Sequence, residues 1–472
     1  MQNEILLKNL LVESYANEGK CVGHHEGKVV FVKGTLPGEL VEARVIRNKK
    51  EWMEAEVTGV NKASADRQIP FCEHFGQCGG CQWQHMKYEA QIRNKEIAVI
   101  DTLERLGKIS IKEKLPIVGC DTDRYYRNKL EFTFSHREWQ TGNAWKNNPE
   151  QVDYPALGFH YPKYFDRVFD VKRCHLQPPL ADRIRLAVKN YTTENGYEYF
   201  NLRNQTGLMR NLMIRMSTTG EVMVLVVFTG KNEEKIFPLM EFLRKEFPEI
   251  TSLQYTINNK ANDTLYDLDI ITHSGSDAIY ERIANPDGIG TGLKFRISAK
   301  SFFQTNTKQA EKLYACVKDF ASLNGNELVY DFYTGTGSIA LYIADKCKKV
   351  IGIESVPQSI EDAKVNAAIN NIQNISFHVA DIAKILNQRF YSEHGIPDIV
   401  ITDPPRTGMH PDVIKELLQM RPKKIVYVSC NIATQARDLH MLSASYSVER
   451  IRPFDLFPQT HHVENVAELK LV

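Results

Sequence analysis

Cys430 is a residue whose type and position could do chemistry. It follows the apolar run Ile425–Val428 and Ser429, a pattern typical of a buried strand that ends at the cysteine. In open α/β sheets, ligands bind outside the carboxyl ends of the strands, so this thiol could be a nucleophile at a ligand crevice. The alternative is a buried filler, because free thiols are among the most buried side chains. This stretch alone leaves both interpretations open.

A second group of cysteines comprises Cys72, Cys78 and Cys81. Two glycines between the last two would let the backbone wrap closely around a bound group. Zinc sites usually show two Cys-x-x-Cys pairs, whereas this segment has one, so the spacing favours an iron–sulfur cluster completed by a distant cysteine. Cys120 and Cys174 are both candidates for the fourth ligand. Zinc and unligated thiols are the alternatives.

A glycine turn follows the expected strand at residues 327–332. The turn contains Gly335 and Gly337, which allow a ligand to approach the backbone closely. Glu354 ends the next expected strand, where a carboxylate can accept hydrogen bonds from both hydroxyls of a ribose. This layout fits either NAD or S-adenosylmethionine.

Acids end four successive expected strands, at Asp331, Glu354, Asp381 and Asp403. Four carboxylates at one edge of a sheet favour a cationic sulfonium nucleoside over a pyrophosphate. Asp381 is placed where it could bond the amino group of adenine. The alternative for each acid is that it caps the helix that follows.

Length and composition limit the class of protein that positions these residues. A chain of 472 residues forms more than one domain, and its 43% hydrophobic and 25% charged residues are ordinary for a soluble protein. The net charge of +1 excludes a global basic field, so any nucleic-acid surface must be local. The chain has nine cysteines, and we see no signal peptide at its N-terminus; an odd number of cysteines in an apparently non-secreted chain argues against a disulfide framework. No apolar run has the length of a membrane span. We expect a cytoplasmic protein.

The first domain is expected at residues 1–62, as a small β-barrel. Its strands are expected at 28–32, 42–46 and 54–57, with a turn at 19–23. This arrangement resembles the TRAM domain, an OB-like module of RNA-modifying enzymes. The basic segment 47–50 could contact phosphate or be a solvated hairpin tip.

A central α+β domain is expected at residues 63–300. It begins with the cysteine group and an amphipathic helix at 86–107, which we expect to pack on the catalytic domain. The residues expected to face inward on this helix are Ile92, Ile97, Ile100 and Leu103. Residues 124–134 interleave basic and aromatic side chains, which suits phosphate contact and base stacking. The alternative is a strand whose charged side chains face outward. Strands and helices alternate over residues 301–472, which predicts a Rossmann-like doubly wound parallel sheet.

Taken together, the motifs resemble those of the RNA uracil-5-methyltransferase family, over essentially the whole chain. The resemblance is strongest to the branch that acts on 23S ribosomal RNA, with a TRAM domain and a 4Fe-4S cluster. It rests on the cysteines at 72, 78, 81 and 174 and on the segments 303–306, 331–337, 403–406, 429–431 and 457–464. Thr334 departs from the family pattern, which often has cysteine there.

The resemblance implies a multidomain α/β methyltransferase that uses S-adenosylmethionine. It makes Cys430 the nucleophile that attacks carbon 6 of uracil, and Glu464, expected in a late loop, the base that removes the carbon 5 proton. It assigns cofactor contacts to Gln304, Tyr333, Ser338, Glu354, Asp381 and Asp403, and cluster ligation to Cys72, Cys78, Cys81 and Cys174.

The implied partner is 23S ribosomal RNA, with a target base that leaves its stack to reach the thiol. Arg406 is a candidate for contact with RNA phosphate. No membrane and no obligate protein partner are expected, and the chain is expected to be a monomer.

Three rival functions remain open at this point. A tRNA-directed member of the family is disfavoured by the cysteine group and the TRAM barrel. An NAD-dependent oxidoreductase would leave Cys430 and Glu464 without roles. A non-catalytic RNA-binding protein would not need acids at four strand ends.

Overall fold

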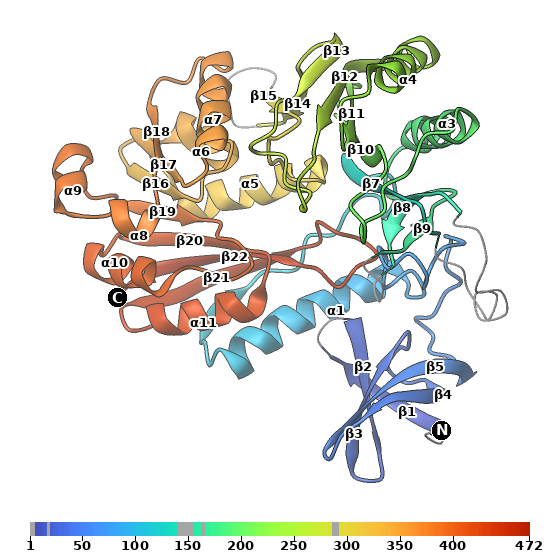
Figure 1. The fold of residues 1–472 in the computed structure, drawn as a ribbon. Coiled ribbons are helices and arrows are strands. Elements are labelled where there is room, and N and C mark those ends of the chain that lie inside the picture. The colour runs from blue at the N-terminus through green and yellow to red at the C-terminus, as the bar shows by residue number, and fades with distance from the viewer. Residues whose placement is uncertain (1–4, 17–18, 139–153, 162–165, 286–291) are drawn as a thin grey trace. The chain divides into compact units, whose positions relative to one another are not determined.

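The computed structural model describes residues 5–16, 19–138, 154–161, 166–285 and 292–472 (Figure 1). They form two compact units. The first runs to Ala98 and includes Phe457–His462, and the second comprises Val99–Leu456 and Val463–Val472. Within the described ranges, no helix has both the length and the apolar character needed to cross a membrane.

The first unit begins with a closed β-barrel in the strand order β1–β2–β3–β5–β4. The strands are β1 (Leu6–Tyr15), β2 (Lys20–His25), β3 (Lys28–Lys33), β4 (Leu40–Asn48) and β5 (Trp52–Lys62). Successive side chains of a strand face opposite sides, and the inward ones, such as Leu10, Val30 and Ala55, form the barrel core. The β-barrel predicted for this end of the chain is present.

The turn predicted at residues 19–23 is wrong, because Lys20–His25 form β2 and pair with β3. Gly23 lies inside this strand, where an added Cβ would be 2.4 Å from the backbone oxygen of Leu11. The glycine therefore permits two strands of a small barrel to approach closely, and it does not reverse the chain.

The predicted helix at 86–107 is present as α1 (Tyr88–Asp101), which continues into a π-helical turn, Thr102–Leu106. Its predicted inward face is partly wrong, since Ile97 is 57% exposed. Gln91 and Lys95 are buried instead, and both donate hydrogen bonds to backbone carbonyls, Gln91 to that of Trp83 and Lys95 to that of Phe457. A hydropathy pattern misses this face because its buried members are polar and satisfied by the backbone.

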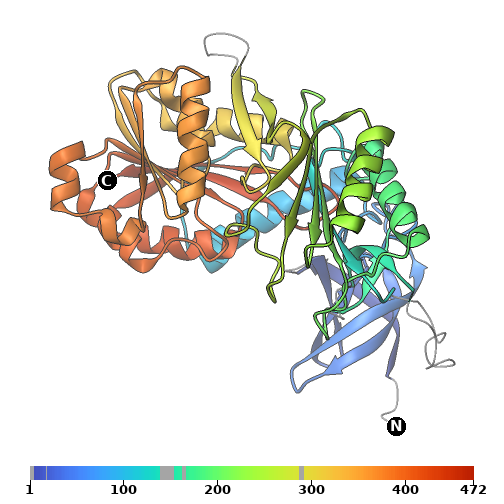
Figure 2. The same cartoon turned by 45° about the horizontal axis from the view of Figure 1, so that its top comes forward.

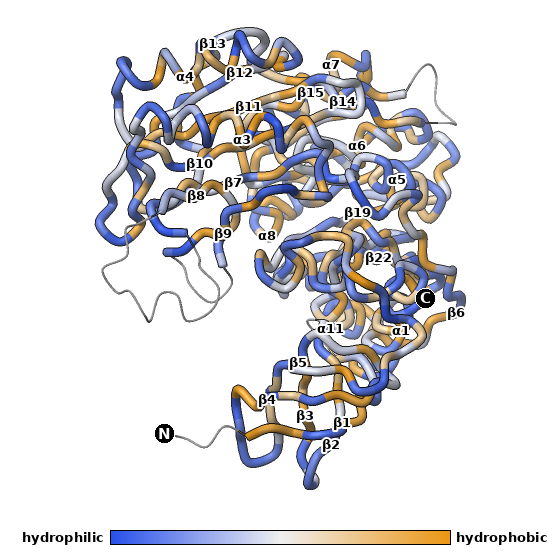
Figure 3. Tube along the Cα trace, turned by 90° about the vertical axis from the view of Figure 1, so that its right-hand side faces the viewer, coloured by the Kyte–Doolittle hydropathy of each residue, from blue (hydrophilic) through white to orange (hydrophobic). Residues whose placement is uncertain are grey.

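The second unit contains a seven-stranded sheet in the order β13–β12–β11–β10–β7–β8–β9. Its strands are β7 (Lys129–Ser135), β8 (Ala156–His160), β9 (Val168–Asp170), β10 (Met209–Met216), β11 (Val222–Phe228), β12 (Ile250–Ile257) and β13 (Ile271–Gly275). Helices α3 (Pro179–Glu194) and α4 (Glu233–Glu246) contact each other and pack on this sheet (Figure 2). Every residue of β11 is buried, and its strand is coloured as strongly apolar in Figure 3. The middle of the chain is therefore α+β.

An eight-stranded sheet in the order β18–β17–β16–β19–β20–β22–β21–β6 forms the rest of this unit, beside the hairpin of β14 (Ala278–Ile283) and β15 (Leu293–Ser298). Its strands are β6 (Ile111–Lys114), β16 (Leu328–Phe332), β17 (Lys349–Glu354), β18 (Ile375–Val379), β19 (Ile399–Thr402), β20 (Lys424–Ser429), β21 (Tyr446–Phe454) and β22 (Glu464–Leu471). Strands β16 to β20 are parallel, and β22 runs antiparallel to both of its neighbours.

Helices cover both faces of this sheet, as a doubly wound fold requires (Figure 1). They are α5 (Thr307–Ala321), α6 (Ser338–Ile343), α7 (Pro357–Ile369), α8 (Ile382–Ile385), α9 (Gln388–His394), α10 (Pro411–Met420) and α11 (Ile432–Leu442), with a 3-10 turn at Ala344–Lys346. Residues far earlier in the chain complete the sheet, because β6 pairs with β21 and Val99, Leu103 and Ile109 join its core.

Candidate functional site

The turn between β16 and α6 is shaped for the close approach of a ligand. Gly335 and Gly337 have φ angles of +56° and +80°, a region that favours glycine. An added Cβ at Gly337 would lie 3.0 Å from the ring of Phe377, whereas one at Gly335 would meet nothing within 4 Å. Gly337 therefore allows tight packing beneath the turn, and Gly335 faces open space.

Glu354 fixes this turn from the end of the neighbouring strand. Its Oε2 accepts a hydrogen bond from the N–H of Gly335 at 3.3 Å. Its Oε1 accepts from the N–H groups of Ser355 at 2.7 Å and Val356 at 3.0 Å. The carboxylate is thus held at the edge of the sheet, directly beside the glycine turn.

Helix capping explains only one of the four acids at strand ends. Asp381 is the N-cap of α8 and accepts a hydrogen bond from the N–H of Ala383 at 3.1 Å. The helices that follow the other three acids have other residues at their N-caps. The carboxyls of Asp331, Glu354 and Asp403 therefore need another explanation.

Asp331 and Asp403 lie at the ends of adjacent strands, because Phe332 pairs with Thr402 in the β16–β19 ladder. The carboxyl of Asp331 is buried and accepts a hydrogen bond from the hydroxyl of Thr334 at 2.5 Å. Burial raises the pKa of both carboxyls to about 7, and the charge of Asp403 adds to the shift at Asp331. A bound cation would stabilise the ionised forms of these two acids.

Cys430 and Glu464 lie side by side at the end of the β20–β22 ladder. Ser429 pairs with Asn465 in antiparallel register, so the next step of the register places Cys430 opposite Glu464. Opposite residues of an antiparallel pair share a face, with Cβ atoms about 4.5–5.5 Å apart. The expectation that Glu464 lies in a loop is wrong, because this buried residue begins β22.

Four ionisable groups are electrostatically coupled here. Burial, followed by the charges of Glu464 and Asp403, raises the pKa of the Cys430 thiol to about 11, and Arg406 opposes the shift. Burial also holds the pKa of Glu464 well above its ordinary value; Asp403 raises it further and Arg406 lowers it. The Arg406 loop is fixed in place, because Asn431 Nδ2 donates to the Arg406 carbonyl at 2.9 Å.

The segment between β15 and α5 places Gln304 near the glycine turn. Thr336 Oγ1 donates to the carbonyl of Phe302 at 3.3 Å, which ties this segment to the turn. Asn128 Nδ2 donates to the carbonyl of Gln304 at 2.9 Å, which ties the same segment to the α+β region. Phe302 itself is 61% exposed.

The remaining predicted cofactor residues, Tyr333 and Ser338, belong to the turn itself. Tyr333 has a φ of +60°, and burial raises the pKa of its phenol to about 12. Ser338 begins α6 and is hydrogen-bonded to Tyr314, a buried residue whose phenol is coupled to Asp403, Asp331 and Glu464. The sequence did not indicate that Tyr314 and Phe302 lie near these residues, because an aromatic residue in an amphipathic helix or near a strand end has no distinguishing pattern.

The four predicted cluster cysteines are divided between the two units. Cys72, Cys78 and Cys81 belong to the first unit, and Cys174 belongs to the second. Cys120, the other candidate, donates its thiol hydrogen to the carbonyl of Asp455 at 3.0 Å. In the described part of the chain, no three or more His, Cys, Asp or Glu residues gather as a metal site would require. The cluster stays a prediction.

Comparison with known proteins supplies independent information. Residues 275–471 match the family described as tRNA (Uracil-5-)-methyltransferase, and residues 8–58 match the TRAM domain. An RNA methyltransferase of Bacteroides thetaiotaomicron is 48% identical over 97% of this chain and 100% of its own length. One of Chlorobaculum tepidum is 37% identical over 97% of this chain and 95% of its own.

A solved structure covers nearly the whole fold. The Pyrococcus abyssi tRNA (uracil-54, C5)-methyltransferase, in complex with S-adenosyl-L-homocysteine, aligns with 98% of this chain and 100% of its own. Its TM-score is 0.73 and its sequence identity is 26%.

Proposed function

Since the chain belongs to the RNA uracil-5-methyltransferase family with an N-terminal TRAM domain, we propose that it transfers a methyl group from S-adenosylmethionine to carbon 5 of a uridine in RNA. The observation that carries this proposal is the register that sets Cys430 opposite Glu464 at the strand ends, beside Asp403 and Arg406. A thiol and a buried carboxyl on one face of one ladder are the two groups this reaction requires.

The residues at the glycine turn fit S-adenosylmethionine. Gly335 faces open space, Glu354 presents a fixed carboxylate beside it, and a cation would stabilise the ionised forms of the buried Asp331 and the half-buried Asp403. Gln304, Tyr333, Ser338, Glu354, Asp381 and Asp403 would hold the cofactor. When bound, it supplies the methyl group as a sulfonium electrophile. The related enzyme of Pyrococcus abyssi, solved with S-adenosyl-L-homocysteine, supports this assignment.

In the protein side of the reaction, the family resemblance implies successive roles for Cys430 and Glu464. The Cys430 sulfur forms a bond to carbon 6 of uracil, and the electron pair of the ring double bond makes carbon 5 nucleophilic. After methylation, the Glu464 carboxylate removes the carbon 5 proton, the ring double bond re-forms, and the thiolate leaves. The raised pKa of Glu464 suits it to this step, because a carboxylate in a buried site is a stronger base.

Arg406 has a defined part in this scheme. The pKa of Cys430 lies near 11, so the neutral thiol predominates at pH 7, and Arg406 is the side chain that lowers this pKa. We assign Arg406 to stabilising the thiolate as it forms, and Asp403, with a pKa of about 7, to accepting the thiol proton. Contact of Arg406 with an RNA phosphate is a second role compatible with its exposed position.

A trapping experiment tests this function directly. RNA containing 5-fluorouridine has no removable proton at carbon 5, so the enzyme and S-adenosylmethionine should form a covalent adduct that intact-protein mass spectrometry detects. Peptide mapping should place the adduct on Cys430. An adduct that persists in Cys430→Ala would overturn the assignment.

We propose that the RNA substrate is 23S ribosomal RNA. This proposal rests on the cysteine spacing, which resembles that of the family branch acting on this RNA. The TRAM barrel does not exclude tRNA, because a tRNA (uracil-54, C5)-methyltransferase aligns with 98% of this chain. Transfer RNA is therefore the second candidate. Mass-spectrometric mapping of 5-methyluridine in both RNA classes, from cells with and without the gene, decides between them.

We also propose that Cys72, Cys78, Cys81 and Cys174 hold a 4Fe-4S cluster. Backbone N–H groups of Gly80 and Cys81 bond to the sulfur of Cys78, and such bonds stabilise a thiolate against the cost of burial. The cluster would have a structural role, since the methyl transfer needs no redox step. Anaerobic purification should give a brown protein with iron and sulfide in equal amounts, and a colourless, iron-free protein would refute this assignment.

A further inference from the structure

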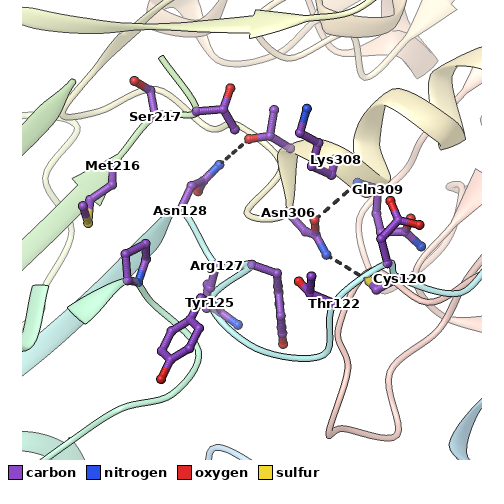
Figure 4. A pocket seen from close by; sticks show the side chains of 15 residues that line it. Cys120, Thr122, Tyr125, Arg127, Asn128, Met216, Ser217, Asn306, Lys308 and Gln309 are labelled. Carbon is purple, nitrogen blue, oxygen red and sulfur yellow. Dashed lines mark hydrogen bonds between the residues drawn. The ribbon is translucent and has the colours of Figure 1, made fainter. Parts of the chain in front are cut away.

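We propose that a cavity at the start of α5 binds a second, unstacked nucleotide of the RNA substrate. This inference rests on the proposed RNA methylation and adds a second part to the substrate site. The cavity has a volume of about 400 Å³ and is lined by residues 120–122, 125–128, 216–218 and 306–309, with Pro178 (Figure 4). That volume lies in the range of about 300–1,000 Å³ that is typical of small-ligand pockets.

The lining combines the two features that single-stranded RNA recognition needs. Tyr125 and Tyr126 offer aromatic rings on which a base can stack, and Arg127 and Lys308 offer positive charge for a phosphate. The Nζ of Lys308 lies 3.8 Å from a carboxylate oxygen of Glu311, and its side chain is 70% exposed. The N-terminus of α5, a helix of 15 residues, adds the positive end of the helix dipole.

A buried acceptor in the wall points to a ligand that donates a hydrogen bond. Gln309 is 1% exposed, and its Nε2 donates to the carbonyls of Val118 at 3.0 Å and Asp455 at 2.9 Å. Its Oε1 is also buried and has no hydrogen-bond partner among the described residues. A ribose 2′-hydroxyl or the amino group of a base would supply a donor to this oxygen.

Hydrogen bonds connect this cavity to the catalytic side of the unit. Asn128, in its wall, donates through Nδ2 both to the carbonyl of Gln304 and to Thr307 Oγ1, at 2.9 Å and 3.1 Å. Asn306 Nδ2 donates to the Leu456 carbonyl at 3.1 Å. One segment, Ser301–Asn306, therefore borders the glycine turn at Phe302 and the cavity at Asn306. A nucleotide near the target in the RNA chain could occupy the cavity while the target base lies at Cys430.

Two variants and a matched control test the cavity. Lys308→Ala removes the exposed charge, and Tyr126→Ala removes a stacking ring. Lys364→Ala is the control, because Lys364 also pairs with a glutamate three residues away on an exposed helix face. The readout is the initial rate of methyl transfer from labelled S-adenosylmethionine to total RNA of cells that lack the enzyme. At limiting RNA we expect a loss of about fivefold or more for Tyr126→Ala. For Lys308→Ala we expect the plot of the logarithm of RNA affinity against the logarithm of salt concentration to have a slope smaller in magnitude by about 1.

At saturating RNA the rates of both cavity variants should approach that of wild type, and their affinity for S-adenosylhomocysteine should be unchanged. Rates at limiting RNA equal to that of the control would overturn the proposal, provided that the variants melt at the wild-type temperature. Inhibition by AMP or UMP at millimolar concentration, lost in Lys308→Ala while the RNA rates stay at wild type, would assign the cavity to free nucleotides and reject the RNA role.

Cross-linking separates this inference from the proposed function. RNA fragments that contain 4-thiouridine should cross-link on irradiation to peptides carrying residues 120–128 or 306–309, and Tyr126→Ala should weaken the cross-link. If wild type methylates no RNA but cross-links at these peptides, the methylation proposal fails and the RNA-binding cavity stands. If methylation occurs and the cross-links fall only elsewhere, the cavity proposal fails alone.

Discussion

Cys430 and Glu464 face each other across the end of the β20–β22 ladder, one register step beyond the pair Ser429–Asn465. The two residues come from different strands, and the antiparallel register brings them onto one face of the sheet. Ionisation of one group makes ionisation of the other less favourable, since the charge of Glu464 raises the pKa of the Cys430 thiol.

Replacing Cys430 with alanine should abolish methyl transfer while leaving cofactor binding intact. The thiol forms the bond to carbon 6, and the proposed cofactor residues lie on other strand ends. Isothermal titration with S-adenosylhomocysteine should give a Kd within about threefold of wild type, since no proposed cofactor contact is lost. Cys347→Ala, which removes a buried thiol elsewhere in the sheet domain, is the control and should retain activity. Residual methylation by Cys430→Ala would contradict the covalent mechanism.

Replacing Glu464 with glutamine should stop the reaction after methylation, with the RNA still attached to Cys430. Glutamine keeps the shape of the side chain but cannot remove the carbon 5 proton, so turnover should fall by about 10²–10⁴-fold. Denaturing gel electrophoresis should show a protein–RNA adduct with unmodified RNA, which wild type does not accumulate. Release of methylated RNA at the wild-type rate would assign the base to another residue.

The sequence allowed the parallel sheet and the acids at its strand ends to be predicted, because apolar runs that end in acids are a local pattern. Glu354 and Asp403 were placed at strand ends in this way, and their contact with a cofactor stays a prediction. The position of Glu464 was not, since it depends on the pairing of β20 with β22, which the order of strands along the chain does not reveal. Helix α1 shows a second limit: Gln91 and Lys95 are buried because backbone carbonyls satisfy them, and no hydropathy pattern reports that.

Edge strand β6 shows the same limit at the scale of a domain. Residues 111–114 precede the α+β sheet in sequence but pair with β21 of the catalytic sheet. The order of residues along the chain placed them in the predicted central domain, residues 63–300. Only the three-dimensional pairing shows that they complete the neighbouring sheet.

Asp403→Asn should change how stability depends on pH. Burial raises the pKa of Asp403 from 3.8 to about 7, so the folded state binds a proton more tightly than the unfolded state does. The wild-type residue therefore lowers the free energy of unfolding progressively as pH rises from about 4 to about 7, and the loss is complete above that window.

Because asparagine carries no titrating proton, Asp403→Asn should gain stability relative to wild type as pH rises through this window. The free energy of unfolding of the variant should rise relative to that of wild type by at most about 1.4 kcal/mol per pH unit. The partial exposure of Asp403 makes the rise smaller. Urea denaturation at several pH values measures it. The control Asp398→Asn should show no pH-dependent change relative to wild type across this window, because Lys423 lowers the pKa of Asp398 from 3.8 and its contribution changes only below that pH. Parallel pH profiles for wild type and Asp403→Asn would contradict the raised pKa.

Alanine at the two glycines of the turn should separate folding from cofactor binding. Gly337 has a φ of +80°, and an added Cβ would lie 3.0 Å from Phe377, so Gly337→Ala combines backbone strain with a clash. We expect it to lower the free energy of unfolding by about 2 kcal/mol or more.

Gly335→Ala adds strain of about 1 kcal/mol and meets no protein atom within 4 Å. Its added methyl occupies the open space that we assign to the cofactor, so the Kd for S-adenosylhomocysteine should rise at least tenfold, about 1.4 kcal/mol, while the melting temperature changes little. A Gly335→Ala protein that binds the cofactor as tightly as wild type would show that the ligand does not approach this face of the turn.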